Sequence, residues 1–110
     1  MNRKLRDLLL GINIIKQIGE IDKPICDIVF DSRKVKKDSL FVAQKGTQID
    51  GHDFIDSAIK DGASVVVLEQ MPNQIKENVT YLQVADSSKA LALLARNYYD
   101  NPSSKLKLIG

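Results

Sequence analysis

The feature that most constrains the fold is a run of small and apolar residues in the middle of the chain. Residues 63–68 read Ala-Ser-Val-Val-Val-Leu, with no polar side chain after the serine. A strand with one face in water alternates apolar and polar side chains, so this run is typical of a strand covered on both faces. It therefore predicts a central strand in an α/β sheet.

Strands and helices alternate around this run. Apolar stretches rich in strand-forming residues predict three more strands, at 26–30, 39–43 and 81–84. Apolar residues at helical spacing predict three helices, at 3–10, between Gly51 and Gly62, and from Asp86 or Ser87 to the Asn-Pro pair at 101–102. A last apolar stretch at 106–110 predicts the start of a further strand. The pattern favours one α/β domain with four or five strands and about three helices. Because no helix separates the first two strands, we expect a mixed sheet.

Composition and charge limit the possible functions. A chain of 110 residues suits one compact domain, and a net charge of +2 with both signs interspersed gives little support to nucleic-acid binding. A basic cluster exists at Lys34, Lys36 and Lys37. Such a cluster is more often a solvated loop, and no aromatic residues alternate with it to stack on bases. No stretch approaches the roughly 20 apolar residues of a membrane span.

The residue types that usually carry catalysis or bind metal are sparse. There is no Walker A loop, Gly-x-Gly-x-x-Gly, His-Glu-x-x-His or Gly-x-Ser-x-Gly motif, so we do not expect the chain to catalyse a reaction by itself. The single histidine, His52, and the nearby Asp50 and Asp53 are more typical of a helix start than of an acid-base pair. Cys26 is the only cysteine, which excludes an intrachain disulfide and a cysteine metal cluster and fits a reducing compartment. We expect a cytoplasmic protein.

Two polar loops follow predicted strands, and ligands of α/β sheets commonly bind at the carboxyl ends of strands. In the first loop, residues 30–34, the Ser32 hydroxyl could donate to a phosphate oxygen, while an arginine could hold the loop through a carboxylate. The alternative is an Asp-Ser turn with solvated basic residues. In the second loop, residues 44–51, two glycines permit close backbone approach and polar side chains could contact a base or sugar. The alternative there is a flexible connection.

Taken together, these stretches resemble the N-terminal domain of the Mur ligase family over nearly the whole chain. The motifs that carry the resemblance are Leu-Arg-Asp-Leu-Leu at 5–9, Asp-Ser-Arg-Lys-Val at 31–35, Leu-Phe-Val-Ala at 40–43 with Gly46, Asp-Gly-His-Asp-Phe-Ile at 50–55, and Asn-Pro-Ser at 101–103. The first two look more like the MurE branch than the MurF branch. MurE-like enzymes add diaminopimelate or lysine to UDP-N-acetylmuramoyl-L-alanyl-D-glutamate (UDP-MurNAc-L-Ala-D-Glu) in peptidoglycan synthesis, and their first domain holds the UDP end.

The resemblance also implies which residues bind the substrate. It assigns nucleotide-sugar contacts to Phe30, Ser32, Thr47, Gln48 and Ile49. Apolar and backbone contacts to the uridine are implied for Phe30 and Ile49, a polar donor for Ser32, and bonds to the nucleotide for Thr47 and Gln48. Some relatives have histidine and alanine in place of Thr47 and Ile49.

The ATP-binding machinery of the family is expected elsewhere. Its phosphate-binding loop, and with it ATP and Mg²⁺, would follow Gly110, so residues 1–110 are expected to be one UDP-substrate-binding domain that ends before the central ATPase domain. The partners implied are this nucleotide sugar and the central and C-terminal domains of the same chain, with no nucleic acid and no membrane. Two alternatives remain open: the same domain of a MurF-like ligase, or a standalone, non-catalytic interaction module.

Overall fold

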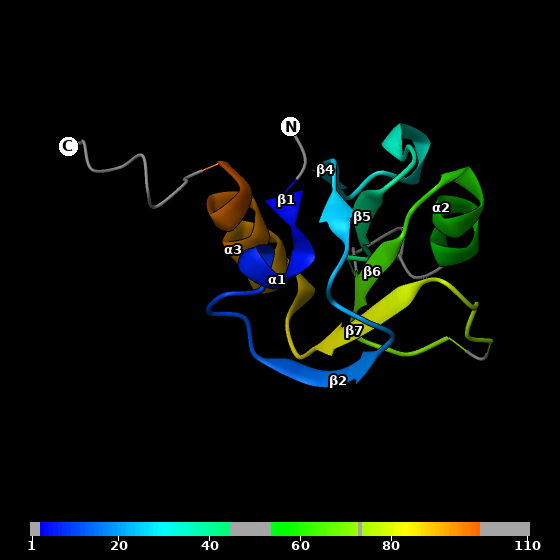
Figure 1. The fold of residues 1–110 in the computed structure, drawn as a ribbon. Coiled ribbons are helices and arrows are strands. Elements are labelled where there is room, and N and C mark those ends of the chain that lie inside the picture. Colours follow the sequence, from blue (N-terminus) through cyan, green and yellow to red (C-terminus); the bar gives the residue numbers. More distant parts are fainter. Residues whose placement is uncertain (1–2, 45–53, 73, 100–110) are drawn as a thin grey trace.

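The computed structural model describes residues 3–44, 54–72 and 74–99, and its main feature is a five-stranded sheet (Figure 1). The strand order is β2 (Ile14–Ile18), β7 (Thr80–Val84), β6 (Val65–Leu68), β5 (Ser39–Val42) and β4 (Asp27–Val29). The four strands β4 to β7 are parallel, and β2 runs antiparallel to β7. A second sheet consists of β1 (Arg3–Lys4) and β3 (Pro24–Ile25).

Strand β6 is central, as its valine run predicts. All four of its residues are buried, and they alternate between two hydrophobic clusters on opposite faces of the sheet. Val65 and Val67 point to one face, whereas Val66 and Leu68 point to the other. The absence of alternation in the sequence therefore reflects burial on both faces.

Helices cover each face of the sheet (Figure 1). The first face carries α1 (Leu5–Leu8) and α3 (Ser87–Tyr99), which bury Leu5, Leu8 and Leu94 in its cluster. The second face carries α2 (Ile55–Asp61), which buries Ile55 and Ala58 beside Phe41 and Tyr81. Each helix thus buries the apolar stripe that its sequence spacing indicates.

Gly62 ends α2 and is required by close packing. Its φ is +124°, in the region that favours glycine, and its N–H donates to the Ile59 carbonyl at 3.1 Å. A Cβ at this position would lie 2.8 Å from the Lys37 Cα. The predicted glycine cap is confirmed, and it also lets α2 approach the segment before β5.

The prediction of a mixed sheet is correct, but the reason for it is wrong. The first two predicted strands correspond to β4 and β5, and these pair in parallel although only residues 30–38 connect them. A short 3₁₀ turn, η1 (Ser32–Lys34), takes the place of a crossover helix. The antiparallel strand is β2, which the sequence did not predict because its exposed positions include Lys16 and Gln17.

Several element boundaries differ from the prediction. The first helix covers only Leu5–Leu8, because Arg3–Lys4 pairs with β3, and the predicted strand at 26–30 is confined to Asp27–Val29. The predicted strand at 106–110 and the Asn-Pro helix stop lie outside the described residues.

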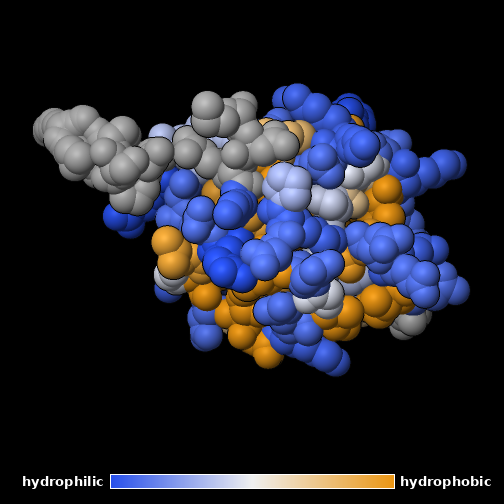
Figure 2. All heavy atoms as spheres, viewed as in Figure 1, coloured by the Kyte–Doolittle hydropathy of each residue, from blue (hydrophilic) through white to orange (hydrophobic). Residues whose placement is uncertain are grey.

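The surface seen in Figure 2 is mostly hydrophilic, with hydrophobic residues reaching the surface mainly in the lower part of the view, where β2 and β7 lie. Ile15, at the irregular position of β2, is 59% exposed. No helix in the described part of the chain is long and apolar enough to cross a membrane.

Candidate functional site

The carboxyl ends of the four parallel strands form one edge of the sheet, which we call the carboxyl edge. The strands end there at Val29, Val42, Leu68 and Val84. Both loops selected from the sequence start at this edge. Because β4 and β5 are neighbours, with Val29 opposite Phe41, the two loops begin side by side. This is the position at which α/β sheets commonly bind ligands.

The first loop is shaped by its own aspartate. Asp31 accepts hydrogen bonds from Arg33 Nε at 3.1 Å and Nη2 at 2.9 Å, and from the Arg33 backbone N–H at 3.0 Å. These bonds and the adjacent positive charge lower the pKa of Asp31 to about 2. The prediction that an arginine holds this loop through a carboxylate is therefore confirmed, and the loop is also an aspartate turn.

This turn presents an aromatic ring and the η1 backbone at the carboxyl edge. Phe30 follows β4 directly and is 63% exposed, so its ring is accessible at this edge. Ser32 is the first residue of η1 and lies between the paired residues Asp31 and Arg33 in the chain. The substrate contacts of both residues stay predictions.

The second loop starts at Gln44, whose side-chain amide donates to Ser88 Oγ on α3 at 3.2 Å. The predicted contacts Thr47, Gln48 and Ile49 lie outside the described residues, as do His52, Asp50 and Asp53. Their roles stay predictions.

A network that the sequence did not predict occupies the rest of the carboxyl edge. Glu69, the residue after β6, accepts hydrogen bonds through Oε2 from the Ser87 N–H at 2.8 Å and from Ser87 Oγ at 2.7 Å. Asp86 accepts from the N–H groups of Ser88 and Lys89 at 3.0 and 3.1 Å. Of the two predicted capping residues, Asp86 is thus the cap of α3, while Ser87 bonds to Glu69. Sequence periodicity contains no signal for a contact between positions 69 and 87.

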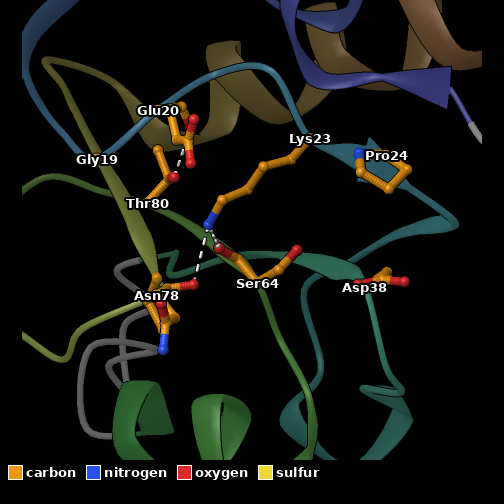
Figure 3. A pocket seen from close by; sticks show the side chains of 9 residues that line it. Gly19, Glu20, Lys23, Pro24, Asp38, Ser64, Asn78 and Thr80 are labelled. Atoms are coloured by element: carbon orange, nitrogen blue, oxygen red, sulfur yellow. Dashed lines mark hydrogen bonds between the residues drawn. The ribbon is translucent and has the colours of Figure 1, made fainter.

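A hollow of about 450 Å³ lies at the opposite edge, where the parallel strands begin; we call it the amino-edge hollow (Figure 3). Its lining includes Gly19, Glu20, Lys23, Asp38, Ser64 and Asn78. Lys23 extends across it, and its ammonium donates to the carbonyls of Ser64 at 3.1 Å and Asn78 at 3.0 Å. Burial lowers the pKa of Lys23, and the charges of Glu20 and Asp38 oppose that shift.

Thr80 Oγ1 also donates to the Glu20 carbonyl at 2.6 Å, whereas Ser64 Oγ is buried without a hydrogen-bond partner in the described part of the chain. Phe30, the predicted substrate contact whose side chain the structure describes, does not line the hollow. In this hollow, Lys23 links the segment after β2 to the starts of β6 and β7. This structural role explains the hollow better than substrate binding does.

Metal binding finds no support in the described part of the chain. Residues 3–44, 54–72 and 74–99 contain no group of three or more His, Cys, Asp or Glu side chains that could hold a metal ion.

Comparison with known proteins identifies the family. The family model described as "Mur ligase family, catalytic domain" matches residues 25–99, about two thirds of the chain. The chain belongs to the Mur ligase family. This confirms the resemblance seen in the sequence motifs.

Two similar relatives come from Cytophaga hutchinsonii and Clostridium tetani. Both are named UDP-N-acetylmuramoyl-L-alanyl-D-glutamate--2,6-diaminopimelate ligase, and they are 44% identical over 108 residues and 46% identical over 112 residues, respectively. In each case the match covers 97% of this chain and 22% of the relative. The chain thus spans about a fifth of the length of the curated relatives it matches. Their names support the MurE branch of the Mur ligase family over the MurF branch.

Solved Mur ligases share the fold. MurF from Acinetobacter baumannii matches 94% of this chain and 22% of its own chain with a TM-score of 0.74 at 22% identity, which shows the fold alone. The MurF ligase from Thermotoga maritima in complex with ADP matches 68% of this chain and 17% of its own with a TM-score of 0.58 at 36% identity. The predicted α/β fold of Mur ligase type is confirmed.

Proposed function

We propose that this chain holds the UDP end of UDP-MurNAc-L-Ala-D-Glu for a MurE-type ligase of peptidoglycan synthesis, in the cytoplasm. The observation that supports this most is the parallel pairing of β4 and β5, which starts both candidate loops next to each other at the carboxyl edge. The substrate class comes from the names of relatives that align with 97% of the chain.

Each part of the first loop has a role in this proposal. Phe30 offers an exposed apolar ring that can pack against the uridine. The Asp31–Arg33 pair fixes the turn, and Ser32 donates a hydrogen bond to the ligand. Thr47, Gln48 and Ile49 complete the site from the second loop.

The domain contributes positioning to the reaction. Anchoring the UDP group, remote from the reacting carboxylate, lowers the entropic cost of aligning that carboxylate with an incoming amine. We propose that the central and C-terminal domains of the whole protein bind ATP and Mg²⁺ and join 2,6-diaminopimelate, the amino acid in the relatives' names, to the dipeptide.

A second candidate is the same domain in a MurF-type ligase, which takes the tripeptide form of the substrate. The 36% identity to the Thermotoga maritima MurF over 68% of this chain favours it. The diaminopimelate ligases match a larger part of the chain at higher identity, so the MurE-type assignment comes first.

Thermal unfolding in the presence of excess ligand tests the proposal. A compound that binds only the folded chain raises Tm, so UDP and UDP-MurNAc-L-Ala-D-Glu should raise it, whereas ATP should not. A Tm that no UDP compound changes would contradict the proposal, as would a larger shift with ATP. A larger shift with the UDP-MurNAc-tripeptide would favour the MurF-type alternative.

A further inference from the structure

The first turn of α3 lies at the carboxyl edge, directly after β7. The N-terminus of a helix is a common binding site for phosphate, because its first N–H groups lack partners within the helix. In a domain that binds a nucleotide diphosphate, α3 is therefore the first place to examine for the phosphates.

All four of the first N–H groups of α3 already have partners. The N–H of Ser87 donates to Glu69, those of Ser88 and Lys89 donate to the Asp86 carboxylate, and that of Ala90 donates to the Asp86 carbonyl at 3.0 Å. Two carboxylates thus take the place that a phosphate would occupy.

Glu69 is held in this position by several contacts. The Ser87 side chain is only 1% exposed, and its hydroxyl donates to the same Glu69 oxygen as its N–H does. The Glu69 carbonyl accepts from Gln83 Nε2 at 3.0 Å, and Gln44 bonds to Ser88 on the same helical turn. The carboxylate is therefore a fixed part of the carboxyl edge.

There is room for an anion beside the first turn of α3. A hollow of about 290 Å³ lies beside this turn, lined among others by Gly11, Asn13, Asp86 and Lys89. Lys89 would attract an anion, but the charges of Glu69 and Asp86 oppose it and their oxygens occupy the donors. At the Asp86 and Lys89 side of the turn, which lines this hollow, the occupied donors and the Asp86 charge rather than lack of space therefore oppose a phosphate.

We infer that Glu69, together with Asp86, excludes anionic groups from the N-terminus of α3 and so directs the diphosphate of a bound nucleotide to the β4 and β5 side of the carboxyl edge. The exclusion follows from the contacts of α3, whereas the direction of the diphosphate rests on the proposed function. Glu69 is thus a specificity-determining residue that need not touch the ligand.

Titration with inorganic phosphate, followed by the amide chemical shifts of residues 87–89, tests the exclusion without any nucleotide. In the unmodified chain these amides should show no saturable shift. The variant E69A/D86N removes both charges, frees the N–H and hydroxyl of Ser87, and keeps an asparagine cap on Ser88 and Lys89. It should show a saturable phosphate-dependent shift at these amides that the unmodified chain lacks.

The control variant D61N/E77A removes the same two charges from exposed positions away from α3 and should gain no saturable shift at residues 87–89. If E69A/D86N does not fold, the isosteric variant E69Q/D86N keeps one acceptor oxygen at each position for these N–H groups and should show a smaller gain. Saturable phosphate binding to these amides in the unmodified chain would overturn the inference. So would a folded E69A/D86N chain with no gain over the control.

Titration with UDP separates the inference from the proposed function. UDP should shift the amides of residues 30–34 more than those of 87–89 in the unmodified chain. The largest shifts at 87–89 would overturn the inference, whereas no shift anywhere would contradict the proposed function and leave the phosphate titration as the test of the exclusion.

Discussion

Asp31 and Arg33 are two residues apart, close enough for the sequence to predict their contact. The structure adds that the arginine binds both carboxylate oxygens, which lowers the pKa of Asp31 to about 2. A depressed carboxyl pKa stabilises the folded state above the unfolded pKa near 4, and this contribution is lost as the pH falls through about 2. The turn at residues 31–33 should therefore keep its conformation at neutral pH.

This pair gives a prediction that an NMR titration of the Asp31 carboxyl can check. The midpoint should lie at about 2 in the unmodified chain and rise toward 3.8 in R33A, because the variant loses the donors that favour the charged form. K36A, which removes a nearby charge that does not bond to Asp31, should leave the midpoint almost unchanged. An unshifted midpoint in R33A would contradict the pairing.

Ser32 gives a prediction for the substrate. Replacing it by alanine removes the proposed hydrogen bond to the ligand, so S32A should weaken binding of UDP-MurNAc-L-Ala-D-Glu by about 1 to 3 kcal/mol, measured by calorimetry, with Tm unchanged. The neighbouring variant K34A is the control for a general loss of charge at this loop. Equal affinity of S32A and the unmodified chain would remove Ser32 from the site.

Other residues could not be predicted because their partners are distant in the sequence. Lys23 bonds to carbonyls 41 and 55 positions away, and Glu69 bonds to a residue 18 positions away. Periodicity and local turn chemistry report only on neighbours along the chain, so such contacts become visible only once the strand order is known.

Among the elements, the central strand is the part most directly predictable from sequence, because burial on both faces removes the polar positions that other strands keep. V66A should lower the free energy of unfolding by about 1 to 3 kcal/mol, since Val66 is fully buried and the lost methyl groups leave a cavity. Urea unfolding measures this. I15A, on the exposed edge strand, should cost much less, and a similar loss in both variants would argue against a central β6.

The strands at the sheet margins were less predictable. Lys16 and Gln17 interrupt the isoleucines of the edge strand β2, and β4 and β5 pair in parallel across a short connection that usually indicates antiparallel strands. The direction in which β4 and β5 pair depends on how the segment between them packs. Gly62 allows the end of α2 to lie close to that segment, at Lys37. The sheet type was therefore predicted correctly from an argument that does not hold for these strands.

Lys23 gives a prediction for how the elements are joined. K23M keeps the length of the side chain but removes the donor to the Asn78 carbonyl and leaves the Ser64 carbonyl with the Thr80 N–H alone, which should cost about 1 to 3 kcal/mol in urea unfolding. K16M on exposed β2 is the matched control and should change stability little. Equal stability of K23M and the unmodified chain would show that water replaces the ammonium.

In the molecule as a whole, the two edges of the sheet have different proposed roles. The carboxyl edge carries the two candidate loops and the closed N-terminus of α3, whereas the amino-edge hollow is crossed by Lys23. The resemblance of the sequence to Mur ligases singled out the two candidate loops but not the α3 network, which depends on the packing of β6 against α3.

Mapping amide chemical shifts during titration with UDP-MurNAc-L-Ala-D-Glu would decide which edge holds the substrate, because it reports on both edges at once. If the carboxyl edge binds the UDP group, saturable shifts should appear at residues 30–34 and none at Gly19, Ser64 and Asn78 of the amino-edge hollow. The largest shifts at those three residues, with none at 30–34, would contradict the proposed site.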